Sequence, residues 1–186
     1  TVFALQVVAD MGENLKVTGQ LVAKGTDDFS PEFDWYYLTY QATDELTLMA
    51  GRRNIPMYYF SEFSEVGYAY PWMRPPSNLY WWQVTQFNGL NAMYDFSLAD
   101  YSNTISVFYG NEYSNDNKEM KYYDELYGGS AKSVNELWTD ILGFNWNLSG
   151  DFFDVRLVYF QNDRDRETIA QDGSIADYTP FSQTFL

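Results

Sequence analysis

The first 25 residues are TVFALQVVADMGENLKVTGQLVAKG, and apolar and polar side chains alternate along most of them. A period of two is the spacing of side chains on one face of a β-strand. Gly12, Glu13 and Asn14 interrupt the alternation, and such residues favour a tight turn. The stretch therefore predicts an antiparallel hairpin. One face would carry Phe3, Leu5, Val7, Leu15, Val17 and Leu21, and the other Gln6, Lys16, Thr18, Gln20 and Lys24.

The same pattern recurs in three further pairs of segments. They are residues 33–42 with 46–53, 87–98 with 103–112, and 137–148 with 152–162. Each segment is close to the roughly nine to eleven residues that a tilted strand needs to cross a bilayer. The sequence therefore predicts an all-β fold with about eight visible strands. We expect residues 1–186 to be a single region of an antiparallel transmembrane β-barrel.

The connections between these strands alternate between short and long. Short turns of three or four residues are expected near positions 12, 43, 99 and 149. The long connections are expected at about residues 26–32, 54–86, 111–136 and from 164 onward. In outer-membrane barrels the short turns lie on the periplasmic side and the long loops outside. The alternation therefore favours a barrel over a soluble sandwich.

Aromatic residues make up 20% of the chain, with 17 Tyr, 14 Phe and 6 Trp. Membrane barrels concentrate Tyr and Trp at the two lipid–water interfaces. Several aromatic residues with apolar-face spacing lie next to predicted turns or loops, which predicts two such belts. The alternative is that aromatic residues are enriched in strands of every kind. The predicted interface aromatics are Tyr36, Tyr40, Tyr94, Tyr109, Trp138, Trp146 and Tyr159.

Composition excludes several classes of function. The formal charge is −15 with only 11 Lys and Arg, which disfavours nucleic-acid binding. The chain has no Cys and no His, so it lacks thiol nucleophiles, disulfides and His-based catalytic triads. We therefore expect no enzyme, no catalytic residues, no metal site and no cofactor.

Residues 54–86 form the longest predicted connection, and long loops of a folded domain are usually functional or disordered. Pro56, Pro71, Pro75 and Pro76 stiffen this segment, and its many Tyr and Trp side chains can pack against a wall. We expect it to fold inward or across a barrel mouth as a constriction loop. Charged residues Glu62, Glu65 and Arg74 would then lie where solute passes.

This segment also carries a family resemblance. The run AGRRNIPMYYFSEFSEVGYAYPWMRPP at 50–76 resembles the porin-like outer-membrane proteins of gammaproteobacteria, and VGYAYPWMRPP at 66–76 is its most specific part. The resemblance implies a general-diffusion porin in the outer membrane of a Gram-negative bacterium. It implies passive passage of small polar solutes and ions through a water-filled, commonly trimeric barrel, among outer-membrane lipids and lipopolysaccharide. Family members are longer, so the resemblance also implies a chain incomplete at both ends.

An inward loop of this size does not fit an eight-stranded barrel, whose lumen is filled by side chains. We therefore expect about half of a pore of about sixteen strands. If Glu62 and Glu65 lie opposite basic wall residues, a transverse field would cross the constriction. The alternative is that these charges are independently solvated. The predicted wall charges are Lys16, Lys24, Arg53, Asp95, Asp154 and Arg156.

Two other functional classes stay open from the sequence. One is a soluble or surface β-sandwich that binds glycans through exposed aromatic side chains, and the other is a non-conducting structural or receptor barrel. Acidic loop clusters could also bind calcium or bridge to lipopolysaccharide through divalent cations, but none has EF-hand spacing and solvated loop charge is the favoured explanation. These clusters lie at Asp27 and Asp28, around Asp116, and around Asp163 and Asp165.

Overall fold

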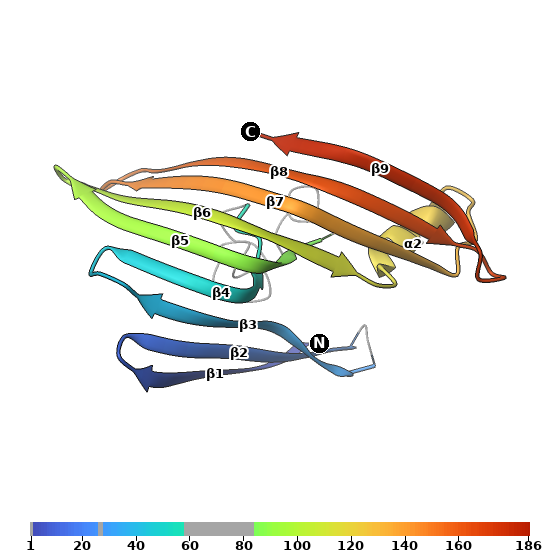
Figure 1. Cartoon of the computed structure of the whole chain (residues 1–186), viewed down its shortest axis with the longest axis horizontal. Coiled ribbons are helices and arrows are strands. Elements are labelled where there is room, and N and C mark those ends of the chain that lie inside the picture. Colours follow the sequence, from blue (N-terminus) through green and yellow to red (C-terminus); the bar gives the residue numbers. More distant parts are fainter. Residues whose placement is uncertain (1, 26–27, 58–83) are drawn as a thin grey trace.

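The computed structural model describes residues 2–25, 28–57 and 84–186. One antiparallel sheet dominates it, with the strands in sequence order and each strand paired with its neighbours in the chain (Figure 1). The all-β, antiparallel prediction is confirmed, and the sheet is open, with β1 and β9 at its edges. The strands are β1 (Val2–Gly12), β2 (Leu15–Lys24), β3 (Pro31–Gln41), β4 (Leu46–Asn54), β5 (Gln86–Leu98), β6 (Tyr101–Ser114), β7 (Ser133–Ser149), β8 (Asp154–Ile169) and β9 (Ile175–Phe185).

The sheet has two unlike ends. The turns that follow β1, β3, β5 and β7 are short and lie together at the left of Figure 1. The connections that follow β2, β4 and β6 are longer and leave from the opposite end. This segregation follows from the meander, because antiparallel strands in sequence order bring alternate connections to the same end. The sequence predicted this arrangement correctly for the first seven connections.

The predicted long loop from residue 164 onward is wrong. Strand β8 continues to Ile169, a five-residue turn follows at 170–174, and β9 then runs alongside β8. The carboxylate of Asp172 accepts hydrogen bonds from the backbone N–H and the hydroxyl of Ser174, which hold its pKa below the ordinary value. The sequence obscured this hairpin because charged residues occupy both faces of β8 beyond residue 162, so no apolar period marks the strand.

The connection between β6 and β7 is also shorter than predicted, because both strands extend beyond their apolar parts. Residues 115–132 form it and include the helix α2 (Lys118–Leu126). The Asn117 side chain caps the helix by accepting a hydrogen bond from the backbone N–H of Met120. Met120 packs with Ala131 and Val134 and so attaches α2 to the start of β7. In the part of the chain that the structure describes, no helix is long and apolar enough to cross a membrane.

Candidate functional site

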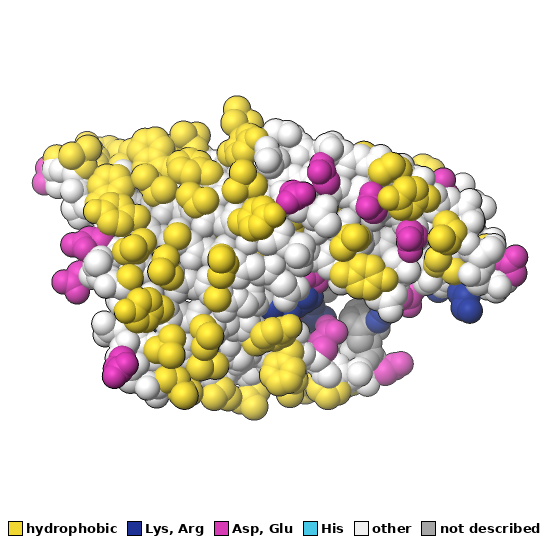
Figure 2. Space-filling model, viewed as in Figure 1, with side chains coloured by type: hydrophobic (Ala, Val, Ile, Leu, Met, Phe, Trp, Pro, Cys, Tyr) yellow, Lys and Arg dark blue, Asp and Glu magenta, His cyan; other side chains and the backbone are white. Residues whose placement is uncertain are grey.

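One face of the sheet, here called the apolar face, exposes large hydrophobic side chains. Register pairs Leu38 with Ala50, then Leu90, Tyr109 and Leu142, so these residues form one row across five strands. In Figure 2 apolar side chains crowd the left and centre of this face and thin out toward the end with the long connections. The exposed set includes Phe3, Leu5, Val7, Phe33, Leu38, Leu48, Leu90, Val107, Leu142, Phe144, Val155 and Leu157.

Six of the seven predicted interface aromatics lie on the apolar face. Tyr40, Tyr94 and Trp146 are near the short turns, and the Trp146 indole N–H donates to Asn103 Oδ1 at 3.0 Å. The other three, Tyr36, Tyr109 and Tyr159, lie toward the opposite end of the strands. On β3 Leu38 lies between Tyr40 and Tyr36, and on β6 Val107 lies between Ile105 and Tyr109 on this face.

The predicted orientation of Trp138 on the apolar face is wrong. Its side chain is 0% exposed and lies on the opposite face, within a hydrophobic cluster. The cause is a bulge at Asp140, where the register shifts between Thr139 and Leu142 and φ of Asp140 is 48°. One extra residue reverses the facing of every residue that precedes it in the strand. A similar register shift occurs at Asp34 on β3.

The apolar face becomes polar along the extended strands. On β8 the residues with this facing are Val155, Leu157 and Tyr159, followed by Gln161 and Asp163. On β6 Asn111 follows Tyr109 on the same face. The change from apolar to polar side chains occurs after Tyr109 on β6 and after Tyr159 on β8. Beyond this point Tyr113 and Leu137 are still exposed on the same face, but polar residues separate them from the continuous apolar surface, which is a band limited to part of the strand length.

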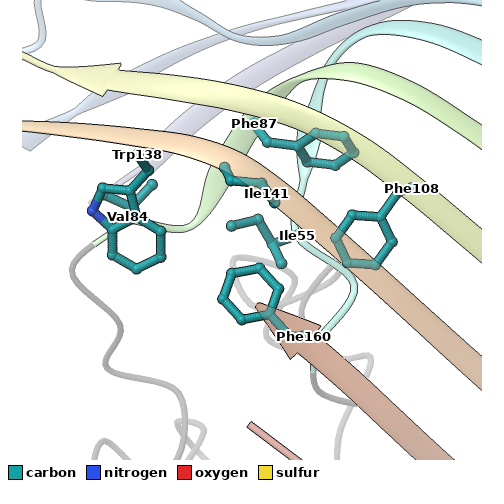
Figure 3. Close-up of a cluster of buried hydrophobic side chains, with 7 residues drawn as sticks. All are labelled: Ile55, Val84, Phe87, Phe108, Trp138, Ile141 and Phe160. Carbon is teal, nitrogen blue, oxygen red and sulfur yellow. The ribbon is translucent and has the colours of Figure 1, made fainter. Parts of the chain in front are cut away.

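The opposite face is here called the loop face, because both ends of the segment 55–85 lie on it. Figure 3 shows Ile55 and Val84 packed with aromatic side chains from four strands. The backbone N–H of Ile55 donates to the carbonyl of Thr85 at 2.8 Å, so the two ends lie side by side. The cluster consists of Ile55, Val84, Phe87, Phe108, Trp138, Ile141 and Phe160, with Met57 and Phe185 against it.

The described wall charges that the sequence predicted also have loop-face register. Lys16 lies in a row with Thr39, Met49 and Asn91, and Asp95 lies in a row with Asn147 and Arg156. Arg53 lies over the Tyr37 ring, with its Cζ 5.0 Å from the ring centroid, and donates to Asn91 Oδ1. Lys24 and Asp154 share this facing on β2 and β8. Glu62, Glu65 and Arg74 lie outside the described residues.

Sequence reasoning missed a partly buried ion pair between β4 and β6. Arg52 Nη1 lies 2.7 Å from Glu112 Oε1, and the side-chain amide of Asn88 also donates a hydrogen bond to the Glu112 carboxylate. Arg52 further donates to Gln86, which donates to Asp34. The pair lies where β5 and β6 part, since their register ends at Asn88 and Asn111. No local pattern reveals it, because its partners are 60 residues apart in the sequence.

A second buried charged group lies on the loop face of β7 and β8, beyond the apolar band. Glu136 accepts hydrogen bonds from Arg164 and Arg166. The Arg164 guanidinium lies between the rings of Trp138 and Phe181, at 5.3 and 4.7 Å from their centroids. The alternation of Asp and Arg along residues 163–166 was the available signal, because it placed both arginines on one face.

Within the described residues, no group of three or more Asp or Glu side chains is placed to hold a metal ion. Comparisons of the chain with family models, curated proteins and solved structures found no match. The features that bear on function are the two faces of the sheet and the segment whose ends lie on one of them.

Proposed function

We propose that this chain forms part of the wall of an outer-membrane porin-like channel through which small polar solutes and ions diffuse passively. The apolar face would contact lipid, and the loop face would line a water-filled lumen. The proposal includes a closed barrel, the outer-membrane location of a Gram-negative bacterium and a trimeric assembly, as the sequence resemblance implies.

The observation that carries the proposal is the exposed apolar band. Leu90 is 64% exposed and Val107 is 44% exposed, and similar exposed side chains lie on this face on β1 and on β3 to β8. Soluble proteins rarely expose continuous apolar surface of this extent. Tyrosine and tryptophan border the band toward both ends, as lipid–water interfaces favour. Exposure of these apolar side chains would be costly in water, whereas contact with lipid would make it favourable.

The loop face supports the lumen assignment. It combines the wall charges with the two ends of the segment 55–85, and Ile55 and Val84 are both buried against it. A segment that leaves and re-enters the sheet on this face starts on the side proposed to be the lumen. This agrees with the predicted constriction loop, whose charged residues lie outside the described part.

Strand direction bears on how such a barrel closes. Strands β1 and β9 run in the same direction, because they are the first and last of nine strands that alternate in direction. An antiparallel barrel has an even number of strands, so closure between β9 and β1 needs an odd number of additional strands. Seven more would give the expected barrel of about sixteen, a size that leaves an aqueous channel.

A pair of arginine substitutions tests lipid contact. Val107 and Asn111 both lie exposed on the apolar face of β6, inside and beyond the band respectively. In a bilayer, Val107→Arg should destabilise the barrel by about 2–4 kcal/mol and Asn111→Arg by at most about 1 kcal/mol. Refolding into lipid vesicles at increasing urea measures both. Equal tolerance of the two substitutions would contradict lipid contact and favour a soluble sheet protein.

Planar-bilayer recording of the full-length protein tests conduction. We expect stepwise conductance, and Arg53→Glu should shift the reversal potential toward cation selectivity because it inverts a wall charge. Lys132→Glu on the β6–β7 connection is the matched charge reversal outside the wall. A lipid-inserted protein without conductance would instead indicate the structural or receptor barrel.

A further inference from the structure

The chain changes direction immediately after β4. The backbone N–H of Met57 donates to the carbonyl of Ile55 at 2.8 Å, which closes a three-residue turn centred on Pro56. The proline ring fixes φ of that residue and so favours the turn. Ile55 is also bonded to Thr85 and buried in the loop-face cluster. Residues 55–57, here called the neck, therefore leave the ladder of β4 and β5 and lie on the loop face.

A side chain from a distant strand donates a hydrogen bond to the neck. Arg156 of β8 donates from Nη2 to the carbonyl oxygen of Pro56 at 2.5 Å, across 100 residues of sequence. Strands β5, β6 and β7 lie between β4 and β8 in the sheet, so this contact spans the loop face. Pro56 lies beyond the last register pair of β4 and β5, Asn54 with Gln86, and its carbonyl accepts the hydrogen bond from Arg156.

We propose that Arg156 is a positioning residue that holds the neck against β8 and so fixes where the chain leaves the sheet. This inference rests on the proposed channel only for its functional consequence, which is a constant pore width beside the neck. The apolar contacts of Ile55 and Met57 resist lateral movement weakly, because they are not directional. A charge-assisted hydrogen bond to a backbone carbonyl is directional and sets a defined position.

Arginine suits this role for a geometric reason. Its guanidinium extends farther than a lysine ammonium and carries several donors in one plane, so it can reach the carbonyl and keep further partners. Arg53 is the natural comparison, since it also lies on the loop face but bonds to Asn91 and lies over Tyr37 within the sheet. Loss of Arg53 should therefore remove a wall charge without releasing the neck.

Spin labelling tests the position of the neck directly. The sequence contains no cysteine, so Met57→Cys introduces a single labelling site. Arg156→Gln should make the nitroxide at residue 57 more mobile, Arg156→Lys should give an intermediate spectrum, and Arg53→Gln should leave it unchanged. An unchanged spectrum in Arg156→Gln, in protein that still folds, overturns the proposal. This measurement does not depend on conduction.

Current recording then tests the consequence. Arg156→Lys keeps the charge but shortens the reach, so we expect greater open-channel current noise with an unchanged reversal potential. Arg53→Lys should change neither quantity. If Arg156→Lys shows the same open-channel current noise as the unmodified channel, Arg156 is only a wall charge and the proposal fails. If the unmodified protein does not conduct but the spin label still responds to Arg156→Gln, the channel proposal fails and the positioning role stands.

Discussion

Gly143 of β7 leaves space for an aromatic ring from the neighbouring strand. The Phe108 ring lies over it, and a Cβ added at residue 143 would be 2.5 Å from Phe108 Cε2 and closer still to Cζ. Carbon atoms in contact prefer about 3.5–4 Å, so the ring would have to move by roughly 1 Å or more. Phe108 is 1% exposed and packs against Phe87 and Phe160, with ring centroids 5.2 and 6.4 Å away. The ring therefore has little room to move.

We expect Gly143→Ala to destabilise the folded protein. Overpacking of a filled core costs about 1–3 kcal/mol. Replacement of glycine within a strand returns about 0.5–1 kcal/mol of backbone entropy. The net loss should be about 1–2 kcal/mol. Gly19 on β2 is the matched control, because an added Cβ there meets nothing within 4 Å. Gly19→Ala should therefore be neutral or slightly stabilising.

Urea unfolding in detergent micelles, followed by tryptophan fluorescence, measures both variants. A second test uses Phe108→Leu, which removes the ring edge that opposes the new methyl group. If the clash explains the loss, Gly143→Ala should cost less in the Phe108→Leu background, with a coupling of about 1 kcal/mol. Equal midpoints for Gly143→Ala and Gly19→Ala, or strict additivity with Phe108→Leu, would refute the reasoning.

Three further predictions concern single contacts. Glu112→Gln should lower the free energy of unfolding by about 1–3 kcal/mol, less than for a fully buried pair because Arg52 is partly exposed. The double variant Arg52→Met with Glu112→Leu should recover part of this loss, as measured by urea titration. Trp146→Phe should lose the hydrogen bond to Asn103 and about 1 kcal/mol of stability, which a lower urea midpoint in detergent micelles would show. Gly51→Ala should cost about 1–3 kcal/mol from backbone strain at φ 139°, visible as a lower thermal midpoint.

The sequence alone determined the strands that carry an apolar period. In residues 1–25 and in the later hairpins, alternation and turn residues were sufficient to predict the antiparallel order, because both signals are local. The same period placed Leu5, Val17 and Leu21 on one face correctly. Where no apolar alternation exists, as at the charged end of β8 and in β9, this signal disappears and the prediction failed.

The tertiary structure decided what depends on neighbouring strands. The bulge at Asp140 reversed the facing of Trp138, and a bulge is defined by register with a partner strand rather than by local composition. The contacts of Arg52 with Glu112 and of Arg156 with Pro56 join residues 60 and 100 positions apart. A period of two assigns a side chain to a face, but only the folded sheet determines which distant group it meets there.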